Sequence, residues 1–214
     1  APAAPPLQLV TRPLFNTREG YGSAVVPGVA QVIVQQTLLI GMLVLAGTRR
    51  ERIGPLAFSR PGLLGIASAF ALIGLCSMLY YNGFVLWLQD YPRGGNPLGT
   101  LLGGALYVAA VVAFALFAGS YFRTRERPFQ LLIVTSLPLF FLSGLSWPAS
   151  SMPPMLVWLS KLFPSTPGVN AMVKLNQMGA SLGETAPELC NLALLVLLYG
   201  ALAMWRYRPA SRPL

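Results

Sequence analysis

The chain has no histidine and few charged residues, and both shortages limit what it can do. None of its 214 residues is a histidine, and 10% are Asp, Glu, Lys or Arg, against about 25% in a typical soluble domain. The lack of histidine excludes a Ser-His catalytic pair and most zinc sites. The sequence also lacks the G-x-x-x-x-G-K-[ST] pattern of a P-loop ATP site. We therefore expect a non-enzymatic chain without catalytic residues, metal or cofactor.

Cysteine and acidic residues are scarce as well. Cys76 and Cys190 fall within apolar stretches, so we expect two buried small side chains and no disulfide framework. All six acidic residues lie outside the centres of the apolar stretches. Because proton- or sodium-coupled carriers generally use ionisable groups inside the membrane, this pattern disfavours secondary transport.

Long runs without any charge are what the sequence does contain. Four runs have 29 to 33 residues and a fifth has 17: Gly20–Thr48, Pro61–Gln89, Gly94–Phe122, Pro128–Ser160 and Leu189–Trp205. A helix needs about 20 apolar residues to cross about 30 Å of hydrocarbon. The runs therefore predict an all-α integral membrane protein, a polytopic bundle of five transmembrane helices near 23–46, 62–88, 98–120, 129–146 and 187–206.

The basic residues gather at the ends of these spans, which argues against nucleic acid as the reason for the net charge of +9. Ten of the fifteen Lys and Arg residues lie on one side if the spans alternate: Arg49, Arg50, Arg52, Arg60, Arg123, Arg125, Arg127, Arg206, Arg208 and Arg212. The positive-inside rule places that side in the cytoplasm. The N-terminus is then outside, and the tail 209–214 is cytoplasmic. An outside N-terminus entering a first span leads us to expect an upstream helix and outer domain, with 1–20 as that domain's end or as an extended arm.

Three glutamines stand out in the first predicted span. Gln31 and Gln35 are four residues apart and share one face of a helix, and Gln36 follows. Polar amides in membrane helices usually hydrogen-bond to a neighbouring helix. Helix packing is therefore the leading interpretation for these three residues, and lining of a substrate path is the alternative.

Small residues mark the third predicted span. The sequence GTLLGG (99–104) and the later AGSYF (118–122) predict close approach of neighbouring helices, because small side chains allow backbones to come near each other.

The segment 147–185 is too broken to span a bilayer and too apolar for a solvated loop. Prolines and tryptophans interrupt it, and they include Trp147, Pro148, Pro153 and Trp158. Two short helices are expected, about 153–163 and 167–180, each half a membrane thickness or less. We expect them to form a re-entrant or interfacial pair at the outer surface.

Three stretches together resemble a known family. VVPGVAQVIVQQTLLI (25–40) looks like the family's second membrane helix, and GTRRERIG (47–54) sits at the place of its coupling loop. LPLFFLSGLSWPASSMPPMLVWLSKLFPSTPGVNAM (137–172) looks like its fifth helix followed by paired outer helices. Over about 20–208 the chain resembles the C-terminal five-span part of an ABC-2 type permease, of the drug-exporter-like bacterial kind (type V ABC exporter-like).

The resemblance implies a transmembrane domain over 21–208 in the bacterial inner membrane. It implies export of a hydrophobic or amphipathic substrate, drug or lipid-like, by a dimer with a second permease subunit, identical or different, and in some systems a periplasmic adaptor. Cytoplasmic ABC ATPase subunits would hold ATP and Mg. They would dock on the coupling loop 47–60, through Arg49, Arg50, Glu51 and Arg52. The alternative role of this loop is to fix the membrane topology through its positive charges.

The resemblance also suggests that the outer segment acts as a gate. Its residues would be Trp147, Pro148, Met152, Pro153 and Trp158, and a passive lid over the same vestibule is the alternative. Two other classes stay open for the whole chain. One is a non-transporting structural or assembly membrane protein, and the other is a membrane enzyme, for which the sequence offers no polar catalytic cluster.

Overall fold

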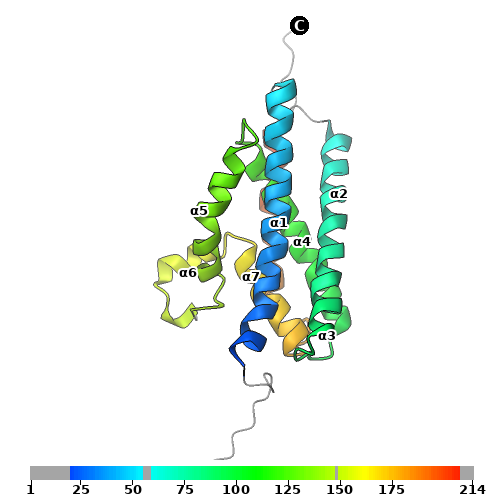
Figure 1. Ribbon diagram of the computed structural model, residues 1–214, viewed down its shortest axis with the longest axis vertical. Coiled ribbons are helices and arrows are strands. Elements are labelled where there is room, and N and C mark those ends of the chain that lie inside the picture. Colours follow the sequence, from blue (N-terminus) through cyan, green and yellow to red (C-terminus); the bar gives the residue numbers. More distant parts are fainter. Residues whose placement is uncertain (1–19, 55–58, 148, 208–214) are drawn as a thin grey trace, which may run out of the picture.

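The computed structural model describes residues 20–54, 59–147 and 149–207, and every regular element in these ranges is a helix (Figure 1). The expected all-helical membrane fold is thereby confirmed. Within these ranges, four helical stretches are long and apolar enough to cross a membrane. They are α1 (Tyr21–Ile53), the continuous stretch of α2 (Arg60–Met78), η1 (Leu79–Val85) and α3 (Leu86–Leu88), then α4 (Pro97–Gly119) and α8 (Ala186–Arg206).

The helix expected at 129–146 is shorter than predicted. α5 covers Arg127–Leu142, 16 residues, which correspond to about 24 Å of helix rise. Gly144 takes a positive φ of 84° directly after it, a conformation that ends helices. The Leu142 carbonyl accepts a hydrogen bond from Thr166 Oγ1 at 3.0 Å. The described part of the bundle therefore contains four full-length spans and α5 as a shorter apolar helix.

Local sequence explains where the helices begin. The Ser59 side chain accepts a hydrogen bond from the Gly62 N–H, and the Asn96 side chain accepts one from the Gly99 N–H at 2.9 Å. Both are N-caps that satisfy otherwise unpaired amides of the first turn. Proline occupies the first turn of α2, α4, α5, α6 and α8, where its missing N–H is not needed.

α4 is the centre of the bundle, in contact with α1, α2, α7 and α8. Its glycines permit this. A Cβ on Gly103 would lie 2.5 Å from a Leu175 methyl carbon, and one on Gly119 would lie 3.1 Å from the Ala46 Cβ. The predicted close approach at GTLLGG and AGSYF is confirmed.

The prediction of buried cysteines was wrong. Cys76 and Cys190 are both exposed on the outside of the bundle, because the faces of α2 and α8 that carry them turn away from α4. An apolar run in a membrane protein buries only the side that meets other helices, and hydropathy does not reveal which side that is.

The broken segment forms η2 (Ala149–Ser151), α6 (Pro154–Ser160), α7 (Ser165–Met172) and η3 (Val173–Gln177). α7 packs against α1, α4 and α8, and its Val169 and Met172 are each 1% exposed. A Cβ on Gly168 would lie 2.2 Å from the Tyr107 ring. At the end of this segment, Lys174 Nζ donates to Glu188 Oε1 of α8 at 2.7 Å.

The turn between α6 and α7 reaches far along the bundle. The Phe163 ring lies 6.0 Å from the Phe114 ring, centroid to centroid, and the Tyr199 hydroxyl donates to the Leu162 carbonyl at 2.9 Å. Phe114 stands 17 residues after Pro97, about 25 Å along α4 by helical rise. The pair is therefore re-entrant, and its turn lies at the depth of the bundle's middle. This depth agrees with the re-entrant form of the expected pair, and the buried side of α7, with Val169 and Met172, holds it between the helices.

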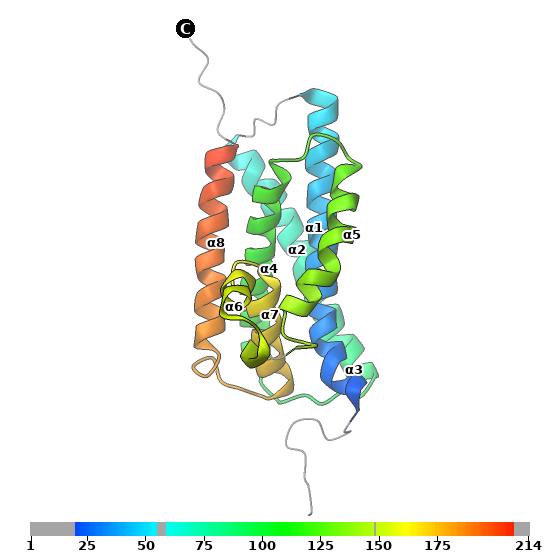
Figure 2. The same cartoon turned by 90° about the vertical axis from the view of Figure 1, so that its left-hand side faces the viewer.

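The basic residues collect at one end of the bundle, as alternating spans require. Figure 2 shows the end of α1, the start of α2, the α4–α5 connection and the end of α8 together at the top. Eight of the eleven Lys and Arg residues in the described ranges belong to these elements: Arg49, Arg50, Arg52, Arg60, Arg123, Arg125, Arg127 and Arg206. We call this the basic end, and the end with α3 and the start of α4 the distal end.

Candidate functional site

The segment expected as a coupling loop is mostly helix. Residues 47–53 are the last turns of α1, and the helix stops at Gly54, whose φ is 89°. Arginine and glutamate are good helix formers, and no proline or glycine interrupts 48–53. Arg49, Glu51, Arg52 and Ile53 are exposed. Residues 55–58 of the predicted loop lie outside the described residues.

Arg50 and Gly47 fix this end of α1 to its neighbours. Arg50 Nη1 donates to the Ser120 carbonyl at 2.8 Å, at the point where α4 ends. A Cβ on Gly47 would lie 2.4 Å from the Thr124 carbonyl oxygen, so the helix touches the α4–α5 connection backbone to backbone. The exposed tip of α1 is therefore attached to the α4–α5 connection, and the half-buried Arg50 is part of that attachment.

Replacing Arg50 with alanine is expected to destabilise the basic end by about 1–2 kcal/mol, because a charge-assisted hydrogen bond to a backbone carbonyl is lost. Thermal unfolding of the purified protein in mild detergent measures the change. Arg52→Ala is the matched control, since Arg52 is exposed on the same turn and should change stability by less than about 0.5 kcal/mol. Equal effects of the two variants would contradict the anchoring role of Arg50.

A cluster of amides joins three segments inside the distal half of the bundle. Gln31 Nε2 donates to the Pro27 carbonyl at 3.0 Å and to Asn82 Oδ1 at 2.8 Å. Asn176 Nδ2 also donates to Asn82 Oδ1, at 3.3 Å, and the Tyr107 hydroxyl donates to the Gln31 carbonyl at 2.8 Å. Asn82 lies in the π-helical η1 and Asn176 in the π-helical η3, a rare backbone form that often occurs at functional sites.

The other two glutamines behave differently. Gln35 is completely buried, and neither of its amide atoms has a hydrogen-bond partner in the described part of the chain. The amide atoms of the half-buried Gln36 are likewise buried without a partner. Gln31 thus bonds across a helix interface, whereas Gln35 and Gln36 make no such bond in the described part of the chain.

Substituting leucine at Gln31 and at Gln35 should have opposite consequences. Gln31→Leu removes the bond to Asn82 and is expected to cost about 1–2 kcal/mol. Gln35→Leu removes a buried amide that makes no bond, so stability should stay the same or rise. Unfolding in detergent compares the two variants. A larger loss in Gln35→Leu would show that this amide has a partner in the working protein.

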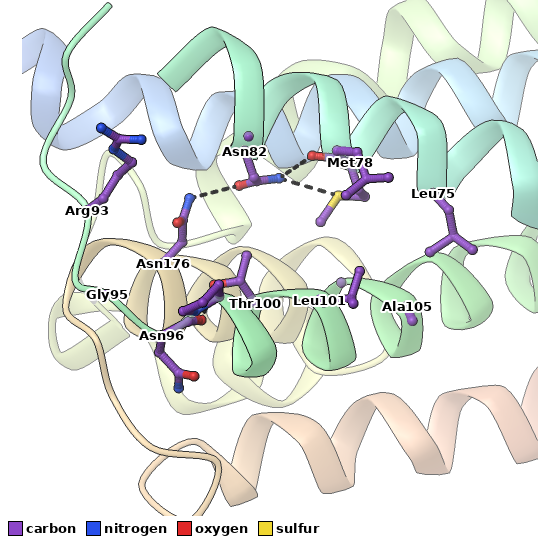
Figure 3. Close-up of a pocket in the computed structure, with 14 residues that line it drawn as sticks. Leu75, Met78, Asn82, Arg93, Gly95, Asn96, Thr100, Leu101, Ala105 and Asn176 are labelled. Atoms are coloured by element: carbon purple, nitrogen blue, oxygen red, sulfur yellow. Dashed lines mark hydrogen bonds between the residues drawn. The ribbon is translucent and has the colours of Figure 1, made fainter. Parts of the chain in front are cut away.

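A cavity of about 560 Å³ opens beside the amide cluster, between α2, η1 and α4 (Figure 3). Its apolar part is lined by Leu75, Leu101 and Ala105. Its polar part, toward the distal end, is lined by Asn82, Asn176, Arg93, Asn96 and Thr100. The volume lies within the range of small-molecule sites, and polarity changes along its length.

The described residues that are expected to form a gate lie in and next to α6. Trp147 and Trp158 are exposed by 56% and 70%, Pro153 is exposed and Met152 is half-buried, and Pro148 lies outside the described residues. They surround α6, whose apolar side chains point away from the bundle, whereas α7 is buried in it.

Lys161 is the unexpected residue of this segment. It is exposed, stands in the α6–α7 turn, and its Nζ lies 4.4 Å from the centroid of the Trp158 ring. Because that turn lies at the depth of the bundle's middle, the charge would be costly in contact with hydrocarbon. The face with Lys161 therefore suits water or protein better than lipid tails.

The sequence pattern of the ABC-2 family transporter proteins matches residues 1–205. The chain belongs to this family. It is therefore a transmembrane permease subunit, and permeases of this family work with an ABC ATPase. No curated protein matches the chain.

Sequence reasoning missed several residues that shape this permease. Asn82 accepts hydrogen bonds from Gln31 across 51 residues and from Asn176 across 94, and no spacing rule connects such positions. The depth of Lys161 depends on how α7 packs, which no sequence spacing reveals. Arg93 had one available signal, since it is an isolated cation close to a predicted helix start.

Proposed function

We propose that this permease exports a hydrophobic or amphipathic compound across the bacterial inner membrane, as one of two permease subunits driven by a separate ATPase that holds ATP and Mg. The basic end faces the cytoplasm in this proposal, following the positive-inside rule. The residues before α1 and the distal end then face outward.

The observation that carries the proposal is the tip of α1. Its exposed residues Glu51, Arg52 and Ile53 continue the helix past the basic end, while Arg50 and Gly47 attach it to the α4–α5 connection. A rigid projecting helix end can transmit a push from a bound ATPase to α4, the element that contacts most of the bundle. A flexible loop would absorb such a movement.

The face with α5 and α6 is the proposed side of the second subunit and of the substrate path. It exposes Ile133, Val134, Leu137, Met155 and Trp158 together with Lys161. Lipid could cover the apolar residues but is a poor environment for the charge. α6 is the proposed gate element, because α7 is locked by Tyr107 and the Lys174–Glu188 ion pair.

The test is ATP hydrolysis by material purified through a tag on this chain. Full-length protein extracted from its native membrane in mild detergent should bring down a P-loop ATPase, and the complex should hydrolyse ATP faster when hydrophobic or amphipathic compounds are added. Well-folded protein that repeatedly brings down no ATPase, even after gentle crosslinking, would favour a non-transporting assembly role.

A further inference from the structure

We infer that the cavity between α2, η1 and α4 is a binding site for an anionic amphiphile of drug-like size, with its acidic group at Arg93 and its apolar part toward Leu75 and Ala105. That such a molecule is exported rests on the proposed function, whereas its binding in the cavity does not.

The arrangement of polarity along the cavity is the first reason. Figure 3 shows Arg93, Asn96 and Asn176 at one end and Leu75 and Ala105 at the other. Ala105 stands eight residues after Pro97, so the apolar end lies about 12 Å deeper along α4 by helical rise. A molecule lying along this axis meets cation and amides first and hydrocarbon side chains last.

The state of Arg93 is the second reason. It is exposed at the rim, and no carboxylate in the described ranges forms an ion pair with it. Guanidinium groups bind carboxylate, phosphate and sulfonate through paired N–H donors. An anionic head group would give this cation the partner that the surrounding described residues do not supply.

The walls of the cavity are fixed in advance, which is the third reason. The Asn96 Nδ2 donates to the Ala180 carbonyl and the Gly94 N–H to the Asn176 carbonyl, both at 2.6 Å. Gly179 lies against Gly94 with a φ of 67° that suits glycine. The loop with Arg93 is thus tied to the segment after η3, and binding would need little reordering.

A second groove provides an internal comparison. It has about 450 Å³ and lies between α2, α4 and α8, where Leu64, Ala109, Val196 and Met204 are among its lining residues. Ser68 is the sole polar side chain among them, and no charge is present. Such a groove can hold any hydrocarbon chain and should not distinguish the charge of a head group.

The test is photolabelling of the full chain in phosphatidylcholine nanodiscs, without ATPase, using a diazirine-bearing palmitic acid at a pH where it is anionic. Peptide mapping should locate labelled residues at 75–83 and 100–105. Dodecanoate should compete there at least about tenfold better than dodecanol, as expected for one added charge-assisted contact. Labelling of the apolar groove at 196–204 should show no such preference.

Variants make the result specific. Arg93→Gln should reduce labelling of the cavity about tenfold, while Arg93→Lys and the exposed control Arg125→Gln should retain it. Ala105→Trp, which shortens the apolar end, should abolish it in protein that still elutes as a single species. Unchanged cavity labelling in Arg93→Gln or in Ala105→Trp would overturn the inference, as would labelling confined to the apolar groove.

Two further outcomes keep this inference separate from the proposed function. Phosphatidylglycerol can be added to the nanodisc as a competitor. If it displaces the probe as well as dodecanoate does, the cavity holds a resident lipid, and the assignment to a drug-sized amphiphile is overturned. A copurifying ATPase with no cavity labelling would overturn the site and leave the permease function intact. Labelling of the cavity in a protein that brings down no ATPase from its native membrane would support the site and count against the export proposal.

Discussion

Replacing Gly168 with leucine is expected to force α7 out of the bundle and to abolish the native packing of the distal half. A Cβ at this position already lies 2.2 Å from the Tyr107 ring, and Tyr107 is completely buried and bonded to α1. Neither partner can retreat without opening the core. Overpacking of this kind costs about 3 kcal/mol or more. Thermal unfolding in detergent should show a large decrease in Tm.

Accessibility of Met172 provides the structural readout for that variant. Met172 is 1% exposed beside Gly168, so a cysteine placed there, with Cys76 and Cys190 changed to serine, should react with a maleimide only when α7 is displaced. Gly65→Leu is the matched control, because no atom lies within 4 Å of its would-be Cβ. A Gly168→Leu protein with normal Tm and an unreactive cysteine would contradict the buried, re-entrant position of α7.

Replacing Glu51 and Arg52 together with alanine is expected to reduce ATPase binding and stimulated ATP hydrolysis at least about tenfold, the effect of about 1.4 kcal/mol. Both side chains are exposed, so folding should be unaffected. Copurification of the ATPase and hydrolysis by the complex measure the change.

The control for this double variant is another exposed acid-base pair at the same end. Arg125 and Glu126 lie 3.5 Å apart with side chains 65% and 68% exposed, and their replacement by alanine removes the same charges. Full ATPase binding in this control is expected. If instead the Arg125–Glu126 variant loses the ATPase and the Glu51–Arg52 variant keeps it, docking occurs on the α4–α5 connection.

The membrane helices could be predicted because they follow from local composition. Charge-free runs located α1, the α2–α3 stretch, α4 and α8, and arginines at the run ends gave the alternation that places eight basic residues at one end. The glycines of α4 also correctly predicted close packing of the neighbouring helices. These features depend only on residues close together in the sequence, and hydropathy and charge patterns record such local composition.

The depth of the broken segment and the candidate sites could not be predicted in the same way. The turn at Lys161 goes deep because Phe163 meets Phe114 and Gly168 meets Tyr107, contacts between residues about 50 or more positions apart. The cavity depends on η1 and η3, where π-helical turns bring Asn82 and Asn176 together. Hydropathy describes neither effect, so it indicated a re-entrant or interfacial pair without its depth and gave Asn82 no role.

We propose that a separate ATPase drives this permease through the projecting end of α1. A photoreactive benzoyl-phenylalanine at position 52 tests it most directly, with the same residue at position 87, on the exposed Trp87 of the distal end, as the control. Irradiation of native membranes should join an ATPase bearing a P-loop to the chain at position 52 and not at position 87. An ATPase adduct at position 87, or none at position 52 in folded protein at native levels, would contradict the account.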